Sequence, residues 1–140
     1  LTDLFYMSRY KCSKYSWEPP VLCPYGKDHW SHEQLKLALP EFAKMYNQRP
    51  IYWNGGGVNA NHAFALWFTT RSLKPKHIIE SGVSEGQSTW LLRQAAGPDA
   101  WIYSLDPRKQ DILMFRDSNG KTKYFMGTDF QDLRDMAWSS

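Results

Sequence analysis

An acidic residue follows each of two short apolar runs in the middle of the chain. Glu80 comes after the run at residues 77–79, and Asp106 comes after the run at residues 101–105. Runs of this kind are typical of buried parallel strands. In an open α/β sheet, ligands lie outside the carboxyl ends of the strands. The two acids are therefore expected at one crevice, as in a nucleotide pocket.

The residues between the acids predict a loop and then a helix. Gly82 and Gly86 can bring backbone close to a ligand, because glycine has no Cβ and tolerates positive φ. Ser88 and Thr89 would open the helix, whose free N–H groups and positive dipole end face the same crevice. Gly97 followed by Pro98 is a stop signal at its far end.

The spacing of these residues favours one class of nucleotide over another. The glycines form E-x-G-x-x-x-G rather than the dinucleotide fingerprint G-x-G-x-x-G, which makes an NAD site a minor alternative. With an acid closing the next strand, the pattern resembles the class I S-adenosylmethionine-dependent methyltransferases. The run NHAFALWFTTRSLKPKHIIESGVSEGQSTWLL is similar to their sugar- and antibiotic-modifying and cephalosporin-hydroxylase-like branch. The resemblance covers about residues 54–132.

The resemblance implies a Rossmann-like, three-layer α/β fold with a parallel sheet and bound S-adenosylmethionine. It puts Glu80, Gly82 and Gly86 at the amino-acid end of the cofactor and Asp106 at the ribose hydroxyls. A residue near the end of a third strand would lie by the adenine. The cofactor-binding candidates are Glu80, Ser81, Gly82, Gly86, Gln87, Ser88, Thr89, Asp106, Asp129 and Phe130.

Some of these residues have a structural alternative. Asp129 is as well suited to cap a last helix over residues 130–138 as to contact adenine. His62 and Asp129 are the candidates for a general base, but a single histidine at a helix start is more often a capping or packing residue. No catalytic residue is assigned, and no spacing establishes a metal site.

Other elements can be expected around this segment. Ser31 and Gln34 form a capping-box signature before a helix that should end near residue 47, with Pro40 expected to kink or split it. Asn59 or Asn61 can cap a second helix, which Lys74-Pro75 would end. Residues 124–126 suggest a third strand and residues 51–53 a further one. The glycines at 55–57 suggest a flexible turn or lid, or a loop that contacts ligand.

Length and composition predict one globular domain. The 140 residues fit an irregular aromatic arm at 1–30 and a Rossmann-like domain at 31–140. A net charge of +3 without like-charge runs does not call for nucleic acid. No apolar run reaches the ~20 residues that cross a bilayer, so a soluble chain is expected, in the cytoplasm or an organelle interior. Cys12 and Cys23 could form a disulfide or stay free.

Two functions remain open at this stage. The first is a methyltransferase, or its cofactor-binding half, acting on a small or sugar-like acceptor. The second is an inactive Rossmann-like domain that serves as a structural or interaction subunit. The family's sheet has seven strands and the sequence supplies three clear ones, so the domain is expected to be incomplete. A protein partner, a second copy or the aromatic arm would then cover an open sheet edge.

Overall fold

The computed structural model describes residues 30–53, 57–109, 112–129 and 131–132. The chain divides into two compact units, Leu1–Gln34 and Leu35–Ser140, and the second contains the sheet. The expected aromatic arm lies almost entirely outside the described residues, as do Cys12 and Cys23. Within the described ranges, no helix is both long and apolar enough to cross a membrane.

The first helix, α1, spans His32–Tyr46 and begins with the expected capping box. The backbone N–H of Ser31 donates to Gln34 Oε1 at 2.7 Å, and the N–H of Gln34 donates to Ser31 Oγ at 3.1 Å. Pro40 lies inside this one helix, so of the two expected effects, a kink or a split, the split does not occur. Proline removes a single N–H donor. Packing of Phe42, which is buried, supplies stability that propensity does not.

The second helix, α2, spans Ala60–Leu73 and packs on α1 through aromatic rings. Phe42 lies 5.2 Å from Phe64 and 5.6 Å from Trp67, measured between ring centroids. Of the two expected caps, Asn59 is the one used, since its Oδ1 accepts from the N–H of His62 at 3.1 Å. The α2 start, and with it His62, is thereby fixed in place.

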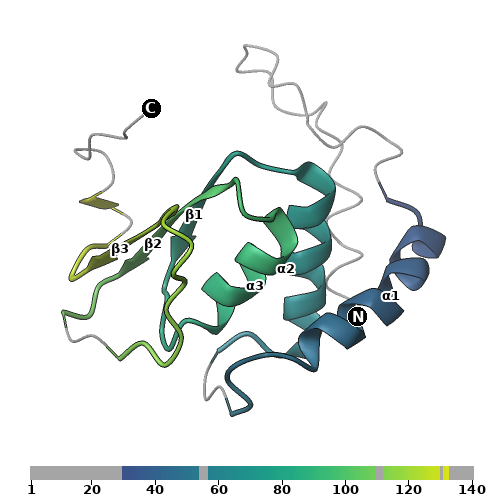
Figure 1. Ribbon diagram of the computed structural model, residues 1–140, viewed down its shortest axis with the longest axis horizontal. Coiled ribbons are helices and arrows are strands. Elements are labelled where there is room, and N and C mark those ends of the chain that lie inside the picture. The colour runs from purple at the N-terminus through teal and green to yellow at the C-terminus, as the bar shows by residue number, and fades with distance from the viewer. Residues whose placement is uncertain (1–29, 54–56, 110–111, 130, 133–140) are drawn as a thin grey trace, which may run out of the picture. The chain divides into compact units, whose positions relative to one another are not determined.

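The sheet has three parallel strands in the order β1-β2-β3. They span His77–Ser81, Trp101–Asp106 and Thr122–Met126, close to the predicted positions. Helix α3, Gln87–Ala96, connects β1 to β2, and Figure 1 shows it beside α2. The described chain is thus an α/β fold with a parallel sheet, a partial Rossmann-like fold as the sequence predicts.

Two details of the sheet differ from the sequence-based expectation. β1 is not a buried strand, because Glu80 is its one buried residue and Ile79 is 48% exposed. Among the described strands β1 pairs with β2 alone, so its other edge and part of one face stay accessible. Residues 51–53 form no strand either. Ile51 is buried, but the Tyr52 hydroxyl turns back to donate to the Asn47 carbonyl at 3.3 Å.

Candidate functional site

The loop between β1 and α3 is held against the carboxyl end of β2 by backbone contacts. The N–H groups of Gly82 and Val83 donate to the Leu105 carbonyl at 2.9 and 3.3 Å. The N–H of Ser84 donates to Asp106 Oδ2 at 3.0 Å. Parallel pairing of β1 with β2 makes this possible, because both strands then end at the same edge of the sheet. The loop and the second acid therefore meet as expected.

The two loop glycines serve different purposes. Gly82 has φ +86°, and a Cβ built there would meet nothing within 4 Å, so its backbone is open to a ligand. Gly86 has φ +98°, and a Cβ there would lie 2.2 Å from the Phe115 carbonyl oxygen. The same segment runs along the loop, since the N–H groups of Met114 and Phe115 donate to the Glu85 carbonyl. Gly86 is thus required because the backbone at Phe115 passes close to it. The sequence-based expectation was that a ligand would approach it instead.

Glu80 lies between the sheet and α3 and is 7% exposed. Its Oε2 accepts from the Thr89 hydroxyl and from the Ser104 hydroxyl, both at 2.6 Å. Burial raises the pKa of the Glu80 carboxyl above its ordinary value, and the hydroxyl hydrogen bonds offset part of that rise. Oε1 is buried without a hydrogen-bond partner. Through these contacts Glu80 fixes α3 on the sheet.

Asp106 is 1% exposed, and its carboxylate accepts four hydrogen bonds. Arg108 donates from its backbone N–H and Nε to Oδ1, at 3.0 and 2.8 Å, and from Nη2 to Oδ2 at 2.8 Å. The Arg108 side chain holds the pKa of Asp106 well below its usual range, against the opposing effect of burial. Asp106 is therefore ionised at neutral pH. Arg108 was not among the residues expected at the site, although its place two residues after the acid was visible in the sequence.

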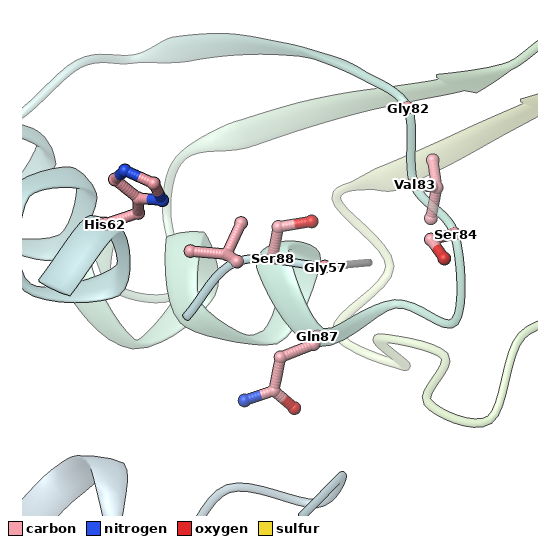
Figure 2. Close-up of a pocket in the computed structure, with 8 residues that line it drawn as sticks. Gly57, His62, Gly82, Val83, Ser84, Gln87 and Ser88 are labelled. Carbon is pink, nitrogen blue, oxygen red and sulfur yellow. The ribbon is translucent and has the colours of Figure 1, made fainter. Parts of the chain in front are cut away.

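A cavity of about 300 Å³ opens beside the loop. It lies between the start of α2, the β1–α3 loop and the start of α3 (Figure 2). In this view Ser88 lies between His62 and Ser84, and Gln87 extends from the start of α3 in a different direction. The lining is polar in part, and consists of Gly57, Val58, His62, Gly82, Val83, Ser84, Gln87 and Ser88.

The start of α3 offers hydrogen-bonding groups to this cavity. The helix has no side-chain cap, so its first N–H groups are not satisfied by one. Gln87 is 3% exposed, and neither its amide oxygen nor its amide nitrogen has a hydrogen-bond partner. Buried polar groups of this kind are uncommon in proteins and often mark a ligand or water site. Donors for an anionic ligand group are therefore present.

The remaining candidates lie at varying distance from this cavity. Ser81 lines a second cavity of about 410 Å³ between β1 and α2. Thr89 is buried and contacts Glu80 instead of the cavity. Asp129 is exposed and lines neither cavity, and its N–H donates to Asp132 Oδ2 at 2.8 Å. Phe130 and the end of the predicted last helix lie outside the described residues.

Sequence reasoning missed Val58 and Ser84, whereas a loop that contacts ligand was one of the two roles expected for the glycines at 55–57. Gly57 and Val58 line the cavity together with Ser84, whose φ is +52°. A triple glycine before α2 was the available signal for the first two. The described residues contain no group of three or more His, Cys, Asp or Glu side chains that could hold a metal ion.

Comparison with known proteins identifies no family for this chain. No protein-family model matches it, and no curated protein is significantly similar in sequence. Among solved structures, the crystal structure of cofactor-bound Rv0187 from MTB aligns with a TM-score of 0.49 and 18% sequence identity. The alignment covers 72% of this chain and 48% of that one, so this chain corresponds to about half of that protein's length. At this level the similarity assigns no function.

Proposed function

We propose that this chain binds S-adenosylmethionine and belongs to a methyltransferase that acts on an oxygen or nitrogen of a small or sugar-like acceptor. The observation that carries the proposal is the hydrogen bond from Ser84 N–H to Asp106. It joins the glycine loop after β1 to the carboxylate at the end of β2. The adenosine and the amino-acid part of the cofactor could then be held by neighbouring backbone segments. The sequence pattern that predicted this pairing is the methyltransferase pattern.

The residues present fit such a cofactor. Gly82 leaves open space where a bulky group must approach the backbone. The uncapped start of α3, with Ser88 beside it, suits the carboxylate of an amino-acid group. Asp106, ionised and at the next strand end, suits ribose hydroxyls. S-adenosylmethionine, when bound, supplies a methyl group that is already activated on a sulfonium.

The protein's own task would then be positioning and exclusion of water. Glu80 fixes α3 on the sheet through Thr89 and Ser104, and we assign it a structural role toward the cofactor. His62 is the imidazole among the residues that line the cavity, and imidazole is the commonest general base in enzymes. Its place at the start of α2, fixed by Asn59, makes it the stronger of the two candidates for a base, since Asp129 does not line the cavity.

Calorimetric titration with S-adenosylmethionine and S-adenosylhomocysteine tests the proposal directly. We expect micromolar binding by the wild-type chain and a loss of at least about tenfold in Asp106→Asn, which keeps the shape but removes the charge. Asp99→Asn is the matched control, because its side chain is 94% exposed and pairs with Lys121 away from the cavity. A folded chain that binds neither ligand, or that binds NAD instead, would contradict the proposal.

A second candidate function rests on the accessible side of β1. Ile79 is 48% exposed there, and the second cavity beside this strand has an apolar lining that includes Leu66, Leu73 and Pro75. A domain used as an interaction subunit would bury this surface against a partner. Under this function the chain alone should be poorly ordered and should gain order with its partner. A stable monomer that binds S-adenosylmethionine would exclude it.

A further inference from the structure

The carboxylate of Asp106 has no acceptor capacity left for a ligand. An ionised carboxylate offers about four lone-pair sites. Here the four are taken by the backbone N–H of Ser84 and by the backbone N–H, Nε and Nη2 of Arg108. A pair of ribose hydroxyls can therefore donate to Asp106 only after one or more of these donors has left.

The side chain of Arg108 is the donor that can leave. The two backbone N–H groups belong to segments that are fixed elsewhere. The Asp106 and Arg108 carbonyls both accept from the N–H of Gly127, at 2.7 and 2.9 Å, and the residues just before Ser84 donate to the Leu105 carbonyl. The guanidinium, by contrast, lies on a side chain that is 46% exposed. It can rotate into solvent without disturbing the core, and its departure would free two of the four sites on Asp106.

A second carboxylate near Arg108 can accept the guanidinium after it moves. Glu85 lies in the glycine loop, and one of its oxygens, Oε2, is buried without a hydrogen-bond partner. The Glu85 charge acts on Arg108 in the same direction as that of Asp106, and both raise the Arg108 pKa. Movement of the Arg108 guanidinium from Asp106 to Glu85 would thus replace one ion pair with another, and the positive charge would stay paired with a carboxylate.

We propose that the Arg108 side chain competes with the cofactor ribose for Asp106 and moves toward Glu85 when the nucleoside binds. Arg108 is then the residue that sets the affinity of the site for nucleosides with free 2′ and 3′ hydroxyls. The inference rests on the proposed function and adds to it a residue that must be displaced. This displacement depends on Arg108, which lies just after β2 and is not part of the sequence pattern of glycines and acids.

Calorimetric titration of the full chain with S-adenosylhomocysteine tests the competition. Arg108→Ala is expected to bind roughly three- to tenfold more tightly than wild type, because the ligand no longer displaces a half-exposed bidentate ion pair. Arg108→Lys keeps the charge and both backbone hydrogen bonds but loses the planar fork, so it should also bind more tightly. This variant decides the question if Arg108→Ala does not fold. Lys109→Ala, an exposed neighbour, is the control for loss of one positive charge.

Two further titrations identify the groups involved. With 2′-deoxy-S-adenosylhomocysteine, which lacks one of the competing hydroxyls, the gain in Arg108→Ala should be smaller than with the parent ligand. Glu85→Gln should weaken binding in the wild-type background and have little effect when Arg108 is alanine, since the coupling needs both side chains. Equal effects of Glu85→Gln in the two backgrounds would overturn its role as the receiving group.

The outcomes separate this inference from the proposed function. If wild type binds S-adenosylhomocysteine and both Arg108 variants bind it equally or more weakly, the competition is wrong while the cofactor site stands. If wild type binds weakly or not at all and the variants bind, the competition is confirmed. If wild type and folded variants all fail to bind, the cofactor assignment itself fails, and the competition with it.

Discussion

The hydroxyl of Thr89, on α3, donates a 2.6 Å hydrogen bond to Glu80, on β1. The Ser104 hydroxyl of β2 donates to the same oxygen at the same distance. The buried carboxyl of Glu80 therefore connects β1, on which it lies, with β2 and with α3, whose first residues line the cavity. Because this carboxyl is buried and its pKa is raised, its protonation is linked to the stability of the site.

Glu80→Gln should remove a dependence of stability on pH. A carboxyl whose pKa is raised in the folded state binds more protons there than in the unfolded chain, so wild-type stability should fall as pH rises above its ordinary pKa of 4.5. Glutamine can still accept from both hydroxyls but does not titrate. The melting temperature of Glu80→Gln relative to wild type should therefore be more favourable at pH 8 than at pH 4.5. Thermal unfolding followed by circular dichroism measures this difference.

The control for Glu80→Gln is the same substitution at an exposed glutamate. Glu33, in the first turn of α1, is such a residue, and Glu33→Gln removes the same charge from an exposed position as the matched control. Effects from Asp106 and Asp117, whose pKa values are lowered, appear below about pH 3.8 and are common to all three proteins. A pH-independent difference between Glu80→Gln and wild type would show that folding does not raise the pKa of this carboxyl.

Replacement of each loop glycine by alanine should lower the free energy of unfolding by a different amount. Gly86→Ala combines positive φ with a Cβ placed 2.2 Å from the Phe115 carbonyl, so the free energy of unfolding should fall by more than about 2 kcal/mol. Gly82→Ala also has positive φ but meets nothing within 4 Å, so about 1 kcal/mol is expected. Urea unfolding of the two variants checks the order. If Gly82→Ala were the more damaging, the backbone approach of residues 113–115 would not be what requires Gly86.

Gln87→Met should make the free protein more stable and should reduce the further stabilisation that ligand binding provides. The buried amide of Gln87 has no hydrogen-bond partner, and removing it with little change in volume should raise the free energy of unfolding by about 1 kcal/mol. The proposed site uses polar groups at the start of α3, so the thermal shift caused by S-adenosylhomocysteine should shrink. A stabilised variant with an undiminished shift would place the Gln87 amide outside the site.

The sequence predicted the middle of this fold well because its signals there are local. An apolar run, a glycine loop and a helix stop signal define β1, α3 and β2 to within a residue or two. Asn59 could be anticipated as a cap for the same reason. The meeting of the loop after β1 with Asp106 also followed, since parallel strands end at one edge of the sheet, although the part played by Ser84 did not.

What could not be predicted depended on contacts between distant segments. The exposure of Ile79 depends on what packs against its face of the sheet, and this has no local signal. The reason for Gly86 lies at Phe115, 29 residues away. The ion pair of Asp106 with Arg108 is close in sequence, yet a basic residue in a turn normally extends into solvent, so its geometry required the structure. In each of these cases the sequence did not show which other residue the side chain or backbone group contacts.

Arg93 provides the last prediction, because it holds together the end of the sheet away from the cavity. Its Nε donates to Asp117 at 2.7 Å, and the two side chains are 9% and 7% exposed. The other guanidinium nitrogens donate to the carbonyls of Gly97 and Ala100, at 2.7 and 2.8 Å, and to the Thr122 hydroxyl at 3.0 Å. The arginine thus joins the end of α3 to the starts of β2 and β3.

Arg93→Met should lower the free energy of unfolding by about 3–5 kcal/mol, because it leaves the Asp117 charge buried and without its cation. Arg93→Met/Asp117→Asn should recover part of this loss, since the uncompensated charge is then absent. Burial raises the pKa of Asp117, but hydrogen bonds from Thr122 and Arg93 outweigh it and leave the pKa lowered. Stability from this pair should therefore be present above about pH 3.8 and decline as pH falls below it. Urea unfolding at pH 7 and pH 3 measures both effects, and a double variant less stable than Arg93→Met would show that the cost comes from lost packing and lost hydrogen bonds instead of buried charge.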